Sequence, residues 1–324
     1  MPTRRGALAA LPALLAAPAV AQAQSAAPWP TARPIEVFVP FPAGGGVDTM
    51  VRGILAQVAP RLPGARFVVT NRPGAGGQLG FEANFNAAPD GYTLGAATNT
   101  AMIAISVERS PRYRPAEFTY IANVVDDPAA FWVHPDSPWK DLADLAAAAR
   151  AQPESFGVGT AGVGSDDHIL QLTFEEASGT RLIHIPYNGT APTLRDLLGG
   201  RLPIGSFNMG EGLTLLREGR IRCLGQAGPK RWEAAPGIPT FREQGFDILG
   251  GSARGIAGPP GIPAPIRDAL REAFRDALTD PGFAAEAARL NLPLRPLIGE
   301  EYAAMMAADL ALLQRLWVRR PWKD

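Results

Sequence analysis

The fold of this 324-residue chain is decided by one stretch near its start, IEVFVPFPAGGGVDTM at residues 35–50. Residues 35–39 form an apolar run typical of a buried strand, which Pro40 and Pro42 end. The glycines at 44–46 form a turn, and Asp48 can cap a helix. The stretch therefore predicts a strand, a glycine turn and a helix in succession.

The same unit recurs along the chain. Further strands are predicted at residues 67–70, 92–96, 130–133, 156–159, 182–185 and 221–224, and helices near Gly80, after Asp141, from Asp166 or Asp167, through Leu194, through Leu270 and Phe274, and through Met305 and Leu312. Alternation of strands and helices indicates an α/β fold, in which a parallel sheet carries helices on both faces.

The alternation starts anew near residue 130, which predicts two lobes. We expect the first lobe to comprise residues 33–127 and 226–324, and the inserted second lobe to comprise residues 128–225. A chain of about 300 residues normally divides in this way, because single cores stop growing near that size. Ligand then belongs in the cleft between the lobes, at the carboxyl ends of the strands.

The first residues predict export. Arg4 and Arg5 precede an apolar run from Ala7 to Val20, and small residues offer cleavage after Ala21 or Ala23. This is the pattern of a secretory signal peptide at residues 1–23, read by the Sec or the twin-arginine route, and the run is short for a membrane span. An uncleaved helix at the membrane interface is the alternative.

Composition excludes several classes of function. Without residues 1–23 the chain keeps 29 basic and 31 acidic side chains, a net charge of −2, which does not favour nucleic acid as a partner. Cys223 is the only cysteine, so an internal disulfide is impossible, and the three histidines lack the spacing of a metal-binding helix. We expect no metal and no cofactor.

Several strand-to-helix loops share one chemistry. Small or hydroxyl residues precede a predicted helix at residues 44–46, 74–77, 98–100, 162–165 and 189–190. Glycine allows close approach of the backbone to a ligand, and the N–H groups at a helix start attract an anion. Any one loop is better explained as a tight turn, but five of them in alternating units favour a site for a carboxylate.

Two kinds of enzyme are alternatives to a carboxylate-binding protein. Residues 157–162 match the dinucleotide motif G-x-G-x-x-G, although the motif does not open the first unit and the helix begins only after Gly164. Ser165 and His168 suggest a hydrolase, but they do not stand in a nucleophile elbow. Asp48 and His168 lack a second partner for acid–base work. We therefore expect no enzyme activity.

The chain resembles the Bug family, the extracytoplasmic receptors of tripartite tricarboxylate transporters. The resemblance rests on Pro40-Phe41-Pro42-Ala43-Gly44-Gly45-Gly46-Val47-Asp48, Asn71-Arg72-Pro73-Gly74-Ala75-Gly76-Gly77, Pro89-Asp90-Gly91-Tyr92-Thr93-Leu94, Gly162-Val163-Gly164-Ser165 with His168, Pro186-Tyr187 with Gly189, Leu197-Leu198-Gly199-Gly200, Pro236-Gly237-Ile238-Pro239-Thr240 and Ala257-Gly258-Pro259-Pro260-Gly261. These motifs cover essentially the whole chain after the signal segment, in one order.

The resemblance implies a periplasmic, two-lobed Venus-flytrap fold without enzyme activity. It implies a small carboxylate as ligand, such as a di- or tricarboxylic acid, an acidic amino acid or an aromatic acid, and the permease subunits of a tripartite tricarboxylate-type transporter as membrane partner. Carried over by motif, the ligand contacts would come from Pro42, Ala43, Gly44, Gly45, Asp48, Gly76, Thr98, Thr100, Ser165, His168, Thr190 and Asn208. A sensor subunit for a membrane signalling protein would need the same site, so this function remains an alternative. The protein is expected to be a monomer.

Three positions depart from the family pattern. Asn188 stands where lysine is usual, Met102 stands where histidine is frequent, and Asn208 stands where aspartate is usual. If that aspartate receives a ligand's ammonium group in relatives, Asn208 disfavours amino acids. The sequence thus predicts a preference for a plain carboxylic acid.

Overall fold

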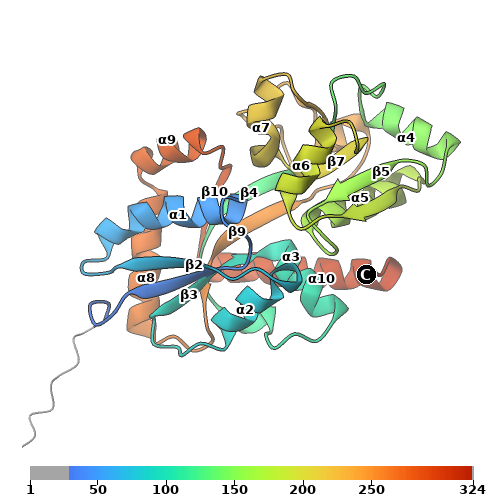
Figure 1. The fold of residues 1–324 in the computed structure, drawn as a ribbon. Helices are drawn as coiled ribbons and strands as arrows, with labels where there is room; N and C mark the ends of the chain where they lie inside the picture. The colour runs from blue at the N-terminus through green and yellow to red at the C-terminus, as the bar shows by residue number, and fades with distance from the viewer. Residues whose placement is uncertain (1–28, 323–324) are drawn as a thin grey trace, which may run out of the picture.

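Two sheets that share one long strand organise the protein in the computed structural model, which describes residues 29–322 (Figure 1). The predicted signal peptide lies outside the described residues. The strands are β1 (Ile35–Val39), β2 (Phe67–Asn71), β3 (Thr93–Thr98), β4 (Thr119–Val133), β5 (Gly157–Thr160), β6 (Ile183–Pro186), β7 (Ile204–Asn208), β8 (Arg222–Gln226), β9 (Gly251–Gly258) and β10 (Leu294–Ile298). The helices are α1 (Gly46–Val58), α2 (Gln78–Phe85), α3 (Asn99–Glu108), α4 (Leu142–Ala151), α5 (Asp166–Ser178), α6 (Thr190–Leu198), α7 (Met209–Arg217), α8 (Ala264–Leu278), α9 (Pro281–Arg289) and α10 (Glu300–Arg319).

The first lobe is built on the sheet β2-β1-β3-β9-β4-β10. β1 pairs in parallel with β2 and β3, whereas β9, β4 and β10 run antiparallel to their neighbours. Apolar side chains fill both faces of this sheet: Ile54 of α1 and Phe274 of α8 pack on one, and Ile103 of α3 and Tyr302 of α10 on the other. Burial of such side chains from water is the main force that holds each helix layer on the sheet.

The second lobe is built on the sheet β6-β5-β7-β4-β8. β5 pairs in parallel with β6 and β7, and the end of β4 runs antiparallel to β7 and β8. Phe174 of α5 packs on one face of this sheet, and Trp132 stacks on Phe207 on the other, with 5.0 Å between ring centroids. The α/β fold with helices on both faces of each sheet agrees with the prediction, but both sheets are mixed rather than parallel, since β4 and β9 run antiparallel to their neighbours.

The return of the chain to the first lobe differs from the expected one. The strand at 222–226 does not cross over, because β8 pairs with β4 inside the second sheet. Phe241 and Ile248, which the expected boundaries assign to the first lobe, pack in the second lobe's core with Phe131 and Phe174. The chain returns at Gly251, where β9 begins beside Pro128 of β4.

The last residues of the chain connect the lobes a third time. Arg320, directly after α10, donates from Nη2 to Glu175 Oε2 of α5 at 2.6 Å and from Nη1 to the carbonyl of Leu172. Trp322 is 1% exposed and lies in the first-lobe cluster, against which Leu172 of α5 also packs. A first-lobe helix therefore holds a second-lobe helix by both charge and apolar contact.

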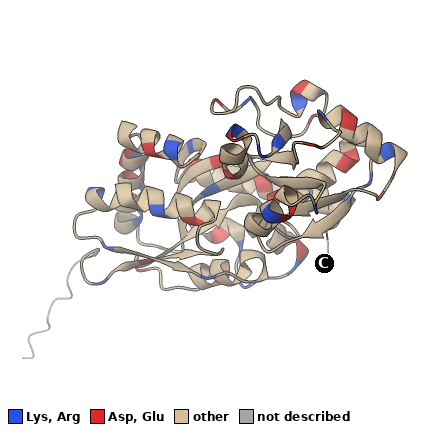
Figure 2. Ribbon diagram, turned by 45° about the horizontal axis from the view of Figure 1, so that its top comes forward, with Lys and Arg blue, Asp and Glu red and all other residues tan. Residues whose placement is uncertain are grey.

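Charged side chains of both signs are interspersed over the two lobes (Figure 2). Among the described residues, no helix combines the length and the apolar content needed to cross a membrane.

Candidate binding site

The loop between β1 and α1 is exposed and held in shape by Asp48. Asp48 is 4% exposed, and its carboxylate accepts hydrogen bonds from Gly44 N, Arg52 Nε and Asn71 Nδ2, at 2.9 to 3.0 Å. Burial raises the pKa of this carboxyl, but the hydrogen bonds from Arg52, Gly44 and Asn71 outweigh it and lower the pKa overall. Asp48 thus fixes the glycine turn, whose predicted ligand residues Pro42, Ala43, Gly44 and Gly45 face solvent.

The other predicted residues of the first lobe lie at two further loops. Gly76 is exposed in the loop before α2, with a positive φ of 69° that favours glycine. Thr100 Oγ1 donates to the carbonyl of Gly251 at 3.3 Å, at the point where β9 begins. Thr98 is 3% exposed, and its Oγ1 has no hydrogen-bond partner among the described residues. A buried hydroxyl without a partner is costly, which marks Thr98 as a candidate ligand contact.

Ser165 and His168 shape the start of α5. Ser165 Oγ accepts from His168 N, so Ser165 is the N-cap of the helix. His168 Nδ1 accepts from Gly164 N, and its ring stacks on that of His184 with 3.7 Å between centroids. Burial, helped by His184 and Arg320, lowers the pKa of His168 to about 3, so the ring is neutral. The two side chains are therefore not paired as nucleophile and base.

Thr190 and Asn208 converge on Glu211 at the start of α7. Thr190 Oγ1 donates to Glu211 Oε2 at 3.1 Å, and Asn208 N donates to the same oxygen at 3.2 Å. The Asn208 side chain is the N-cap of α7, and Glu211 completes a capping box. Asn208 Nδ2 also donates to Asp166 Oδ2 at 2.7 Å, which brings the starts of α5, α6 and α7 together.

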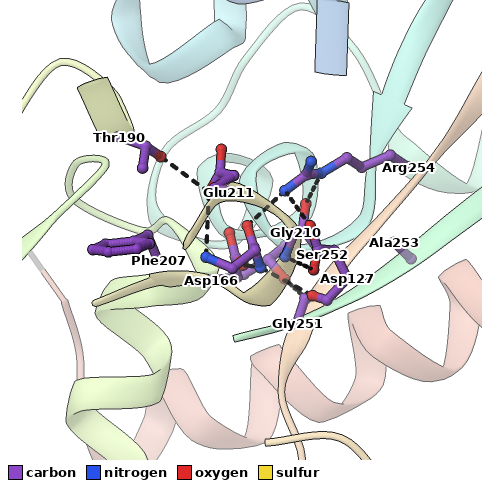
Figure 3. Close-up of polar contacts among 12 residues, drawn as sticks. Asp127, Asp166, Thr190, Phe207, Gly210, Glu211, Gly251, Ser252, Ala253 and Arg254 are labelled. Atoms are coloured by element: carbon purple, nitrogen blue, oxygen red, sulfur yellow. Dashed lines mark hydrogen bonds and ion pairs between the residues drawn. The ribbon is translucent and has the colours of Figure 1, made fainter. Parts of the chain in front are cut away.

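Arg254 of β9 joins this group to the first lobe (Figure 3). Its Nε donates to Ser252 Oγ, its Nη2 donates to Asn208 Oδ1 at 2.6 Å, and Nη2 lies 3.7 Å from Asp127 Oδ2. A side chain at Gly46 would clash with Arg254 Nη1, so the guanidinium lies directly under the start of α1. Elements of both lobes meet at this arginine.

Four carboxyl groups surround the arginine. Burial raises the pKa of Asp127 to about 7, although Arg254 and the N–H of Gly210 oppose the rise. Burial also raises the pKa values of Asp166, Asp167 and Glu211, most strongly for Asp167. Burial works against the charge of Arg254, but the surrounding carboxyls still raise its pKa. The junction of the lobes is therefore rich in acid and holds one buried base.

The structure brings only part of the predicted set together. Thr190 and Asn208 belong to the hydrogen-bonded group around Arg254, and Thr98 lies opposite Arg254 in the β3–β9 register. Asp48 instead bonds Gly44, Arg52 and Asn71 within the first lobe, and His168 bonds Gly164 and stacks on His184 within the second lobe. Arg254, Asp127, Asp166 and Glu211 were not among the site residues predicted from the sequence. A signal for Arg254 existed, because an arginine inside the small, apolar stretch 251–258 needs buried partners.

Alternative chemistries find little support in this geometry. The G-x-G-x-x-G match spans β5 and its loop, but α5 begins only at Asp166, after the motif ends at Gly162, so the motif does not open the helix as a dinucleotide site requires. Among the described residues, no group of three or more His, Cys, Asp or Glu side chains could hold a metal ion.

Comparison with known proteins identifies relatives along almost the whole chain. Residues 51–305 match the model of the tripartite tricarboxylate transporter family receptor. A UPF0065 protein of Cupriavidus necator, encoded in the gbd 5′ region, is 31% identical over 97% of this chain and 96% of its own. Protein BugT of Bordetella pertussis is 32% identical over 84% of each chain.

Solved structures agree with these relatives. MatC of Rhodopseudomonas palustris with bound malate has a TM-score of 0.79 at 27% identity, covering 87% of this chain and 98% of MatC. Rpa4515 of R. palustris with adipate has a TM-score of 0.81 at 27% identity, covering 90% and 97%.

The predicted resemblance and two-lobed fold are thus confirmed. The family consists of periplasmic solute-binding receptors, not of enzymes, and two of the structural neighbours carry the carboxylates malate and adipate. The match covers well over half of the sequence, and this chain belongs to the tripartite tricarboxylate transporter family receptors.

Proposed function

We propose that the protein is a periplasmic receptor that captures a small carboxylate between its lobes and presents it to the permease subunits of a tripartite tricarboxylate-type transporter. The observation that carries the proposal is the meeting of the starts of α1, α5, α6 and α7 at Arg254. Helix starts offer N–H groups to an anion, and a buried guanidinium supplies the charge. Closure of the lobes around the ligand is the proposed mechanism.

The finer parts of the proposal follow from family membership. The ligand is a di- or tricarboxylic or aromatic acid, as the malate and adipate of the two R. palustris proteins suggest. Export removes residues 1–23, and the mature receptor acts as a monomer without catalysing a reaction. Its ligand contacts are Pro42, Ala43, Gly44, Gly45, Asp48, Gly76, Thr98, Thr100, Ser165, His168, Thr190 and Asn208, with Asp48 acting through the loop that it holds.

Thermal-shift screening tests the proposal. The chain lacking residues 1–23 is screened against di-, tri- and monocarboxylic acids, aromatic acids and nucleotides. A ligand at a hundred times its Kd should stabilise the fold by about 2.7 kcal/mol, and it should be recovered unchanged. Absence of a shift with every acid, or conversion of a bound acid into a product, would contradict the proposal. A shift with nucleotides alone would favour the dinucleotide reading.

A further inference from the structure

The two lobes are attached to each other at two separate places. The first is the strand crossing, where β4 leaves the first sheet after Pro128 and β9 enters it at Gly251. Lobes joined by two adjacent strands can turn about them as about a hinge. The second is the segment 320–322, which follows α10 and which we call the C-terminal clamp. Figure 1 shows α10 running from the first lobe to below α5 of the second lobe.

The clamp holds the second half of α5 through a charged side chain. Arg320 Nη2 donates to Glu175 Oε2 at 2.6 Å, and Arg320 Nη1 donates to the carbonyl of Leu172 at 3.0 Å. Glu175 is itself buried, and its other oxygen, Oε1, accepts from Gln171 Nε2 and from Leu182 N. The carboxylate is thus fixed by its own lobe, so Arg320 bonds a rigid point and not a mobile surface group.

The clamp also contacts the loop that leads into α5. Trp322 is buried and packs edge-on against Trp317 of α10, with 4.8 Å between ring centroids. A Cβ at Gly164 of the loop would lie 3.2 Å from Ala104 Cβ of α3 and 3.5 Å from Trp322 Nε1. The contacts at Gly164 and Glu175 are about 15 Å apart along α5, from a rise of about 1.5 Å per residue. The attachment therefore extends along most of the helix.

Trp322 carries a donor that this arrangement of the lobes does not use. Its Nε1 has no hydrogen-bond partner among the described residues, although the side chain is 1% exposed. A buried N–H without an acceptor costs free energy, and phenylalanine would fill an apolar site without that cost. Packing in this one arrangement therefore does not explain the tryptophan. The loop that it touches, residues 162–165, carries Ser165, a predicted ligand contact.

We propose that the C-terminal clamp is a second hinge point, which together with the strand crossing confines the motion of the lobes to rotation about one axis. Two separate points of attachment define a line, and a rigid lobe held at both turns only about that line. Arg320 and Trp322 are then positioning residues for ligand capture, because they determine how the loop 162–165 approaches the first lobe. The inference rests on the proposed function, in which the lobes close on the ligand, but its test needs no ligand.

Distances between spin labels on the two lobes, measured by electron paramagnetic resonance, test the inference in the ligand-free protein. The labels are attached at Ala56→Cys on α1 and Ala147→Cys on α4, both at exposed positions, in a Cys223→Ala background. This labelled parent protein should give a narrow distance distribution. Arg320→Met and Trp322→Ala should each widen the distribution about twofold, because the second lobe is then attached at the strand crossing alone.

Conservative variants and a neighbouring arginine supply the controls. Arg320→Lys keeps a cation at Glu175 and should restore a narrow distribution. Trp322→Phe keeps an aromatic ring against Trp317 and should widen the distribution less than Trp322→Ala does. Arg319→Met removes an exposed pair with Glu176 and should leave the distribution of the parent unchanged.

Urea unfolding of the same variants separates a positioning role from a structural one. Arg320→Met and Trp322→Ala variants that lose stability but keep the narrow distribution show that the clamp only supports the fold, which overturns the inference. A parent distribution as wide as that of these variants also overturns it. If no acid shifts the unfolding temperature in the ligand screen, the proposed function fails, whereas the distances still decide whether the clamp limits the motion of the lobes.

Discussion

At the scale of the residue, the protonation of Asp127 makes the stability of the protein depend on pH. Its Oδ1 accepts from Gly210 N, its Oδ2 faces Arg254, and burial raises its pKa to about 7. A carboxyl whose folded pKa lies above its unfolded value binds its proton more tightly in the folded state. Its contribution to stability is therefore complete at acid pH and is lost as the pH rises through 7.

We expect the unfolding free energy of the ligand-free protein to fall by about 2–3 kcal/mol between pH 5 and pH 8 from this carboxyl alone. Asp127→Asn keeps the acceptor for Gly210 N but does not titrate, so the fall should shrink by that amount. Urea unfolding at each pH measures the change. Asp136→Asn, at an exposed position, should reproduce the wild-type curve, and an equal slope for both variants would contradict the role of Asp127.

Substitution of Gly46 tests whether Arg254 is held at the start of α1. A Cβ there would clash with Arg254 Nη1, and the guanidinium cannot move aside without losing Ser252 and Asn208. Gly46→Ala should therefore cost about 1–3 kcal/mol of unfolding free energy, although alanine is the better helix former. Gly237→Ala, which meets no atom within 4 Å, should stay within about 0.5 kcal/mol. Wild-type stability of Gly46→Ala would show that Arg254 is not held at the start of α1.

Sequence reasoning at the residue scale recognised loops better than side chains. The glycine turns were predictable, because a run of glycines is typical of a turn. The pairing of Arg254 with Asp127 and Asn208 joins residues up to 127 positions apart, and no local pattern encodes it. The sequence predicts a helix that begins at Asp166 or Asp167, which describes the place of Asp166 at the start of α5 but not its neighbours across the lobe junction.

At the scale of the element, the strands with apolar, β-branched runs were predictable, whereas β7, β9 and β10 were not. β9 is the sequence Gly-Ser-Ala-Arg-Gly-Ile-Ala-Gly, which is typical of a loop. The structure shows why it needs small residues: a side chain at Gly255 would clash with the Ala122 carbonyl of β4, and one at Gly251 would meet the Asp127 carbonyl. Close packing between strands selected glycine here, against strand propensity.

Helix α5 offers a test at the element scale. Ser165 caps the helix through His168 N, and α5 carries both Asp166 and the neutral His168. Ser165→Ala should lower the unfolding free energy by about 1 kcal/mol. Ser155→Ala, at an exposed position, should change it by less than about 0.5 kcal/mol. Chemical denaturation of the two variants measures the difference, and equal stability would mean that the cap is not needed.

At the scale of the whole molecule, the alternating pattern was sufficient to predict two lobes, but not how they are connected. Asp126-Asp127-Pro128 reads as a loop, because proline is rare in central strands. In the structure these residues lie within the 15-residue strand β4, at the point where it leaves one sheet for the other. The segment after β8 also differs from the prediction: its apolar residues Phe241 and Ile248 pack in the core of the second lobe, and no local pattern indicates which of the two cores they join.

The C-terminal connection between lobes can be tested by comparing neighbouring arginines. Arg320→Met leaves Glu175, whose side chain is 4% exposed, without its cation and should cost about 2–3 kcal/mol of unfolding free energy. Arg319→Met removes a more exposed pair with Glu176, 3.6 Å long, and should cost less than about 1 kcal/mol. Urea unfolding gives both values. Equal losses would indicate that the Arg320 pair is no more than a surface contact.

The position of β9 has a consequence for the order in which the protein can form. β9 lies between β3 and β4 in the middle of the first sheet, yet about 120 residues of the inserted lobe separate it from β4 along the chain. While the chain is still being synthesised, residues 29–133 lack the strand that joins their two halves. The second lobe is contiguous and has its own core, so it can fold first, and the two halves of the first sheet are joined only when residue 258 is available. The lobe that begins the protein is thus the last to become native.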